Sequence, residues 1–212
     1  MKKIFSLLVV AQILCGTLFA QENNGKITLD IYIDPAALFD ANAGPMFQMP
    51  FIKARYFLSS DVAVRLGFDL GFGTDKNYTD ADGEDYVKST SFNFELAPGI
   101  EKQFGGDKFD AFIGVELPIT SYSYNTETKV GDVTVSNKNP NGTGYFGVGL
   151  SGVIGCDYYV LENVYVGAEF SPGLMFYKNS DIVNDGTVTQ KGGTQIGFSI
   201  SSASGIRLGV RF

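Results

Sequence analysis

Hydrophobic and polar residues alternate along most of this chain, which indicates β-strands with one apolar face. The clearest run places apolar residues at every second position: Val62, Val64, Leu66, Phe68, Leu70 and Phe72. Because successive side chains of a strand point to opposite faces, one face of this strand is apolar throughout. The other face carries glycine, alanine, arginine and aspartate. The run is as long as the roughly 9–11 residues that a tilted strand needs to cross a membrane.

Similar runs predict seven more strands, and no segment after residue 20 has the periodicity and caps of an amphipathic helix. The expected strands cover residues 27–33, 47–58, 91–101, 109–120, 146–155, 164–176 and 194–212. The last one has a weak segment at residues 201–204, where we expect a bulge.

The connections between these strands alternate between short and long. Short turns lie near residues 59–61, 105–107 and 162–163, whereas long polar segments cover residues 75–88, 125–143 and 178–193. Short turns on one rim and long loops on the other are typical of bacterial outer-membrane proteins. We therefore predict an all-β fold, an eight-stranded antiparallel up-and-down transmembrane β-barrel with both termini on the short-turn rim.

The N-terminus has the three parts of a secretory signal peptide: two lysines, an apolar run over residues 4–14, and small residues up to Ala20. We predict a signal peptide over residues 1–20, cleaved after Ala20, and one barrel domain over residues 21–212. An uncleaved membrane anchor is disfavoured because the apolar run is shorter than the roughly 20 residues of a spanning helix. Lipid attachment at Cys15 is disfavoured because residues 12–14 do not form a lipobox.

The face opposite the apolar one carries charges of both signs and many glycines. In a narrow barrel interior, buried charges must be paired, and glycine makes room for larger neighbours. A soluble barrel with the apolar face inward is the alternative, but its solvated outer face would favour Lys, Glu and Thr over glycine. We therefore predict a charge network in the lumen, formed by Asp30, Lys53, Arg55, Arg65, Asp69, Glu95, Glu116, Glu169, Arg207 and Arg211.

The composition excludes several kinds of chemistry. The chain contains no histidine, which excludes Ser-His-Asp triads, Cys-His pairs and His-ligated zinc sites. After cleavage the domain has 14 basic and 23 acidic residues, so its net charge of −9 argues against nucleic acid as a partner. Cys156 is then the only cysteine, and no intrachain disulfide is possible. We expect no enzymatic activity and no cofactor.

Aromatic residues gather near the predicted strand ends, as expected for the belts that lie at the two membrane interfaces. The group near the turn rim is Tyr56, Phe104, Phe109, Tyr158, Tyr165 and Phe212. The group near the loop rim is Phe47, Phe72, Phe92, Tyr122, Phe146 and Phe176.

The chain ends on an apolar alternation with a terminal aromatic residue: Ile206, Leu208, Val210 and Phe212. With the signal peptide, the strands and the loop asymmetry, it resembles the small eight-stranded outer-membrane β-barrels of Gram-negative bacteria, the OmpA-transmembrane and OmpX-like group, over residues 21–212. The resemblance implies an outer-membrane location. It also implies that these four residues form a β-signal, which the outer-membrane assembly machinery recognises.

Two of the long loops carry candidate binding features. Residues 75–88 include Asp75, Asp80, Asp82, Glu84 and Asp85 around Gly83, but the EF-hand spacing for calcium fails there, so a solvated acidic loop is favoured. Residues 130–135 are expected to extend a hairpin above the membrane, and its exposed edge is a candidate protein-binding surface.

These observations favour a non-enzymatic outer-membrane protein with a structural or surface-interaction role through its extracellular loops. The alternative is a narrow porin-like channel for ions or small solutes. Wide pores need about 16 strands, whereas about eight leave a filled interior. The expected partners are outer-membrane lipids, the assembly machinery and a surface ligand, and not nucleic acid.

Overall fold

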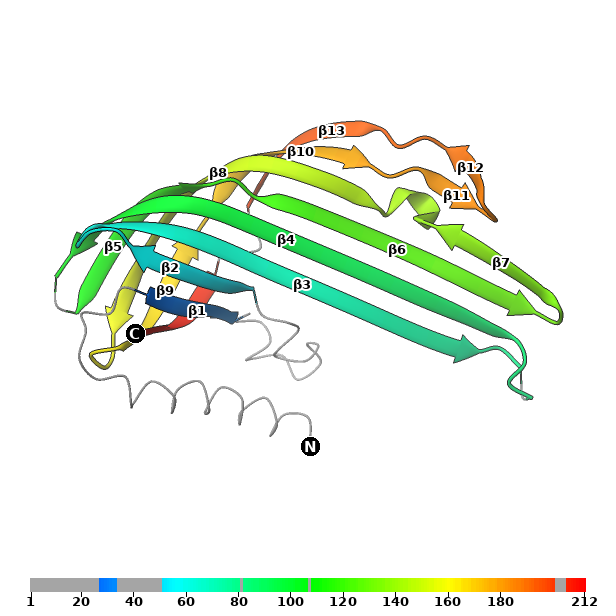
Figure 1. The fold of residues 1–212 in the computed structure, drawn as a ribbon, viewed down its shortest axis with the longest axis horizontal. Helices are drawn as coiled ribbons and strands as arrows, with labels where there is room; N and C mark the ends of the chain where they lie inside the picture. The colour runs from blue at the N-terminus through cyan, green and yellow to red at the C-terminus, as the bar shows by residue number, and fades with distance from the viewer. Residues whose placement is uncertain (1–26, 34–50, 81, 107, 201–204) are drawn as a thin grey trace.

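The computed structural model describes residues 27–33, 51–80, 82–106, 108–200 and 205–212, and these are almost entirely antiparallel β-structure (Figure 1). No helix in this part of the chain is long and apolar enough to cross a membrane. The strands are β1 (Ile27–Ile33), β2 (Ile52–Phe57), β3 (Val62–Tyr78), β4 (Tyr86–Gly105), β5 (Phe109–Glu116), β6 (Ile119–Val130), β7 (Val133–Lys138), β8 (Tyr145–Tyr159), β9 (Val164–Phe170), β10 (Pro172–Asn179), β11 (Ile182–Asn184), β12 (Thr187–Gln190), β13 (Thr194–Ile200) and β14 (Gly205–Arg211), with a 3-10 turn, η2, over Pro140–Gly142.

Eight of the described strands are paired in a closed ring, which lies at the end of the molecule where the C-terminus is found (Figure 1). The pairing runs from β1 through β2, β3, β4, β5, β8, β9 and β14, and β14 pairs with β1 again. Every neighbouring pair is antiparallel and follows the order of the chain. A closed ring pairs backbone groups on both sides of each strand, which the interior of a bilayer requires. The predicted all-β antiparallel class is confirmed.

Two of the predicted strands are interrupted beside a proline. The expected strand over residues 109–120 is divided at Leu117 and Pro118 into β5 and β6, and the one over residues 164–176 is divided at Ser171, before Pro172. Proline has no N–H to donate to a neighbouring strand, so the ladder breaks at these points. Above the ring the sheet continues in the order β3, β4, β6, β8, β10 and β13. The bulge expected at residues 201–204 lies outside the described residues.

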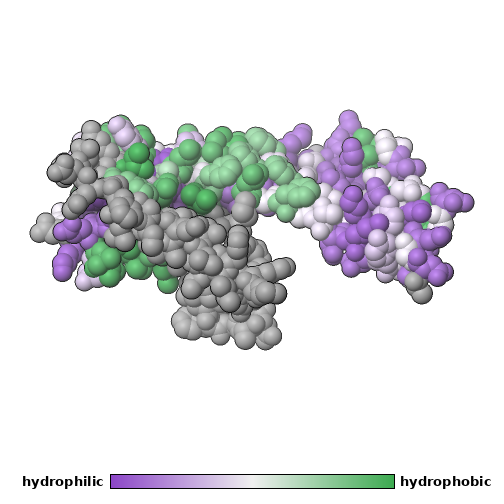
Figure 2. Space-filling view, turned by 60° about the horizontal axis from the view of Figure 1, so that its bottom comes forward, coloured by the Kyte–Doolittle hydropathy of each residue, from purple (hydrophilic) through white to green (hydrophobic). Residues whose placement is uncertain are grey.

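The apolar face of the ring points outward and the polar face points inward. Along β3, Val64 and Leu66 are 39% and 44% exposed, whereas Arg65 between them is only 2% exposed. Figure 2 shows a hydrophobic stretch of surface next to a hydrophilic end. A soluble barrel would bury its apolar face, so this arrangement excludes that alternative and fits a wall in contact with lipid.

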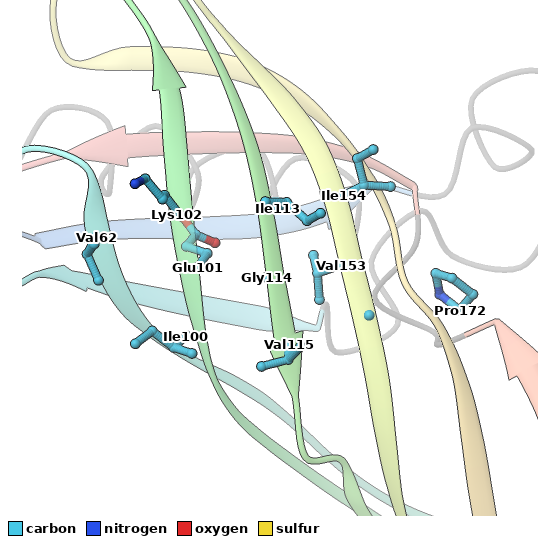
Figure 3. Close-up of a pocket in the computed structure, with 11 residues that line it drawn as sticks. Val62, Ile100, Glu101, Lys102, Ile113, Gly114, Val115, Val153, Ile154 and Pro172 are labelled. Atoms are coloured by element: carbon cyan, nitrogen blue, oxygen red, sulfur yellow. The ribbon is translucent and has the colours of Figure 1, made fainter.

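A shallow apolar groove of about 750 Å³ crosses this outer wall over β4, β5 and β8 (Figure 3). Ile100, Ile113, Val115 and Ile154 line it, and Gly152 has no side chain to fill it. The groove has the apolar character of the wall around it.

The three segments predicted as long loops are largely strands, which corrects that expectation. β3 continues to Tyr78, β6 and β7 form a hairpin around Gly131, and β7 pairs with β11, where Asn137 lies opposite Asn184. The expected hairpin through residues 130–135 is confirmed. We call β7, β11 and β12, together with the ends of β3, β4, β6, β8, β10 and β13 on the same side of the ring, the loop-end sheet. Water reaches both of its faces, so most of its strands need no apolar alternation and lack the pattern that would reveal them.

Most of the aromatic residues expected at the membrane interfaces are on the outer surface, with two exceptions. Tyr56, Phe104 and Phe109 are about half exposed, as expected for the turn rim. Tyr165 is fully buried in the lumen, so its assignment to the outer belt was wrong. Tyr122 is only partly exposed and its ring stacks on that of Tyr145, inside the upper part of the sheet. Phe47 lies outside the described residues.

We expect Val115→Arg to destabilise the protein in a bilayer by about 2–4 kcal/mol, because it places a charge near the middle of the lipid-facing wall. Val133→Arg is the matched control, since Val133 is 64% exposed on the loop-end sheet. Equilibrium urea unfolding in lipid vesicles measures both. An equal loss of stability in the two variants would contradict the assigned lipid-facing surface.

Candidate functional site

A network of nine charged side chains fills the interior of the strand ring. It contains four cations and five carboxylates, and each of its members is at most 5% exposed. Each of the eight strands of the ring contributes at least one member, so the network reaches across the whole lumen. The members are Asp30 (β1), Lys53 and Arg55 (β2), Arg65 (β3), Glu101 (β4), Glu116 (β5), Asp157 (β8), Glu169 (β9) and Arg207 (β14).

Two arginines lie directly opposite each other, and a shared carboxylate joins them. Arg55 on β2 faces Arg65 on β3, an arrangement of like charges that is unfavourable alone. Glu101 accepts a bond from each of them, at 3.1 Å from Arg55 Nη1 and 2.6 Å from Arg65 Nη1. The strand register that brings the arginines together therefore depends on a carboxylate from β4.

Glu169 on β9 and Glu116 on β5 neutralise the cations of β2 and β3. Glu169 Oε1 lies 2.5 Å from Lys53 Nζ and 2.6 Å from Arg65 Nη2. Glu116 Oε1 lies 2.9 Å from the same Lys53 nitrogen and 2.7 Å from Arg65 Nε. Because each carboxylate serves two cations, losing one leaves several buried charges with fewer partners.

The remaining members join β1 and β14, the first and last strands of the ring. Arg207 binds Asp30 at 3.1 Å and also contacts Asp157, whose other oxygen lies 2.8 Å from Arg55 Nη1. The Tyr165 hydroxyl donates to Asp30 and accepts a bond from Arg55 at 2.5 Å. These contacts connect β14 to β1 through side chains as well as through the backbone ladder.

The charged side chains fit because aromatic and glycine positions alternate with them. Phe112, which breaks the apolar alternation of its strand, points inward and lies under the guanidinium groups of Arg55, Arg65 and Arg207, with Arg207 closest at 4.8 Å. In the paired strands, glycines lie directly opposite several of the large charged side chains. A side chain at Gly99 would meet Glu116 and Arg65, and one at Gly167 would meet Asp157 and Arg207. At these glycine positions the neighbouring charged side chains occupy the space that a side chain would need.

The structure brings together seven of the ten residues predicted for the lumen network. Asp69, Glu95 and Arg211 lie elsewhere. Asp69 and Glu95 lie directly opposite each other on β3 and β4, farther from the turn rim, and Asp69 accepts a hydrogen bond of 2.8 Å from Asn93. Arg211 pairs with Asp110 at 3.7 Å near the turn rim. Glu101 and Asp157 were not predicted as members. Both follow the inward parity of their strands, so continuing the alternation through β4 and β8 identifies them.

The other predicted site residues have their own surroundings. In β14, Leu208 lies opposite Ile31 and Val166, and Val210 is buried opposite Leu29 and Val164. In the acidic segment, Asp80 accepts bonds from the backbone N–H groups of Glu84 and Asp85. No group of three or more acidic, cysteine or histidine residues in the described part of the chain is arranged to hold a metal ion.

The loop-end sheet is held by polar contacts between its strands. The Gly131 N–H at the tip of the β6–β7 hairpin donates to Asp85 at 2.6 Å, and Lys76 lies 3.9 Å above the ring centre of Tyr86. The Tyr86 hydroxyl donates to Glu127 at 2.7 Å, and this bond raises the pKa of Tyr86. These contacts join β3, β4 and β6 into one polar surface.

Residues 40–212 match the model of the OmpA-OmpF-like porin family. The chain belongs to this family. No match was found among curated proteins. Family membership agrees with the closed antiparallel ring and its apolar outer wall, and it identifies the chain as an outer-membrane protein of the porin type. The resemblance seen in the sequence is thereby confirmed at the level of the family. Membership also favours a protein without enzymatic activity.

We expect Glu169→Gln to lower the free energy of unfolding by about 3–5 kcal/mol, because it removes one of the two carboxylates that the buried Lys53 and Arg65 share. Asp110→Asn is the matched control, since its partly exposed pair with Arg211 is worth less than about 1 kcal/mol. Urea titration of the two refolded variants gives both values. Similar losses in the two variants would show that the network does not act as one cooperative unit.

Proposed function

We propose that this protein is a closed, non-conducting barrel that anchors the loop-end sheet in the outer membrane for recognition at the cell surface. The observation that carries this proposal is the filling of the lumen. Nine buried charged side chains, packed together with Phe112 and Tyr165, occupy the ring where a channel would need a continuous water path. An ion entering there would have to displace several paired charges at once, which is costly in a low-dielectric interior.

The loop-end sheet supports the second half of this proposal. Long strands continue from the lipid-facing wall into a polar sheet, which Figure 2 shows as a hydrophilic end of the molecule. Regular strands hold their side chains in fixed positions, so a ligand does not have to order them on binding. We propose that this surface, rather than the lumen, meets the ligand.

The second candidate function is a narrow channel for ions or small solutes, which membership of a porin-type family favours. It requires the central ion pairs to open a path, because the same carboxylates that hold Lys53 and Arg65 also close the lumen. The two candidates differ in one measurable property, the conductance of the folded barrel.

We expect residues 21–212, refolded and inserted in a planar bilayer, to show no discrete conductance steps. Arg207 and Glu169 stay paired in the folded state, so the lumen stays filled. Protein from the same preparation is checked for folding by its heat-dependent mobility on gels, and a wide porin added afterwards shows that the bilayer accepts barrels. Reproducible steps from the folded protein would overturn the closed barrel and favour the channel.

The route to the membrane completes the proposal. A signal peptide over residues 1–20, removed after Ala20, would export the chain, and Ile206, Leu208, Val210 and Phe212 would form the β-signal. The support for this is that Ile206, Leu208 and Val210 lie in β14, the strand that closes the ring against β1, and that Phe212 directly follows this strand. A recognition machinery that binds this strand by edge addition would hold it until β1 replaces it. The wall would then contact outer-membrane lipids.

We expect Phe212→Ala to reduce the amount of barrel assembled in the outer membrane severalfold, because it removes the terminal aromatic residue of the proposed β-signal. Phe109→Ala is the matched control, because Phe109 is also exposed near the turn rim but lies on β5. The assembled fraction is measured by heat-dependent mobility in isolated outer membranes. Equal effects of the two substitutions would contradict a specific β-signal.

A further inference from the structure

A polar pocket of about 600 Å³ lies where η2 meets the strands of the loop-end sheet. Six of its described lining residues are amides, and none of them is charged. Within the described part of the chain, no other residue forms a hydrogen bond to these six amide side chains. Their donors and acceptors are therefore available to a ligand. The amides are Asn137, Asn141, Asn179, Asn184, Gln190 and Gln195.

A row of three tyrosines continues from this pocket along the inner face of the sheet. The ring of Tyr145 stacks on Tyr122, with centroids 5.9 Å apart, and meets Tyr177 edge-on at 5.4 Å. Tyr145 lies directly opposite Asn179, and Tyr177 lies directly opposite Gln195. Because opposed residues of antiparallel strands share a face, the tyrosines and these two pocket amides form one continuous surface.

Glycine and backbone geometry shape this surface. Gly147 lies opposite Tyr177, and a side chain there would come within 2.7 Å of the tyrosine ring. On the pocket side, Asn139 and Asn141 adopt left-handed backbone conformations with φ of 49° and 59°. These positions turn the chain around η2 and place Asn141 at the pocket rim.

The combination of these groups selects one class of ligand. An amide side chain both donates and accepts hydrogen bonds, as a sugar hydroxyl does, so amides pair with hydroxyl groups in either direction. Tyrosine rings offer flat apolar faces for the C–H faces of sugar rings and keep a hydroxyl for a polar contact. An acidic ligand would find no cation among the described lining residues. A bound peptide would find few apolar side chains there besides Pro140 and Ile182.

We infer that this pocket and the tyrosine row beside it bind a neutral oligosaccharide, with one sugar unit among the amides and the next on the tyrosine rings. The inference rests on the proposed function, because it names the ligand class of the proposed recognition surface. It places the specificity of this surface at the junction of β7, β10, β11, β12 and β13.

The test is an array of tetrasaccharides probed with the refolded barrel in detergent. The array holds neutral glucose, mannose, galactose and N-acetylglucosamine tetrasaccharides, matched tetrasaccharides that carry a carboxylate or sulfate, and uncharged extended peptides. We expect binding to at least one neutral tetrasaccharide and weaker binding to its charged counterpart. Binding to the peptides or the charged saccharides alone overturns the inference, as does binding to nothing on the array.

Two pairs of variants locate the site, and calorimetry with the bound tetrasaccharide measures them. Asn184→Leu should weaken binding about three- to tenfold, the loss expected for one or two hydrogen bonds, whereas Asn77→Leu on distant β3 should leave it unchanged. Tyr145→Leu should weaken it to a similar degree, and Tyr158→Leu, at the turn end of the same strand, should not. Equal effects within a pair overturn the location.

The saccharide array and the conductance recording test two separate claims. If the barrel does not conduct and binds no saccharide, the proposed ligand class is wrong and the proposed closed anchor is retained. If the barrel conducts and binds a neutral saccharide, the closed anchor is wrong and the proposed binding site is retained.

Discussion

The structure depends on the pairing of charges inside a ring that the membrane forces to close. Strands in a bilayer must have their backbone groups paired on both sides, so eight of the described strands close on themselves and turn one face of each into a narrow interior. That interior holds four cations and five carboxylates away from water. Charges in such a place are tolerable only as a connected set, and the shared carboxylates Glu101, Glu116 and Glu169 supply the connections.

The same constraint explains where the small residues lie. Large charged side chains from neighbouring strands cannot stand opposite each other all around a narrow ring, so glycines oppose many of them. Gly167 lies between Asp157 and Arg207, and Gly99 lies between Arg65 and Glu116. Phe112 then fills the centre and offers its ring to three guanidinium groups. Glycine on this face is therefore part of the packing of the lumen.

Once the lumen is filled, the polar end of the molecule becomes the place where function is best sought. The strands do not stop at the edge of the apolar wall, because β3, β4 and β6 continue and pair with further hairpins. The continuation stays regular without an apolar core, held by backbone ladders and by contacts such as that between Gly131 and Asp85. Its amide pocket and tyrosine row are consistent with a surface that recognises polar ligands.

The sequence by itself determined which residues form the wall and which face the lumen, because a side-chain period of two is a local property of any strand. Seven of the nine charged residues at the centre were predicted from that alternation, and the other two, Glu101 and Asp157, follow the same parity. The partners of these charges needed the tertiary structure, since Asp30 and Arg207 are 177 residues apart and meet only when the ring closes in one register. Most of the loop-end sheet also needed it, because a sheet with water on both faces requires no apolar alternation, and only the hairpin through residues 130–135 was predicted locally.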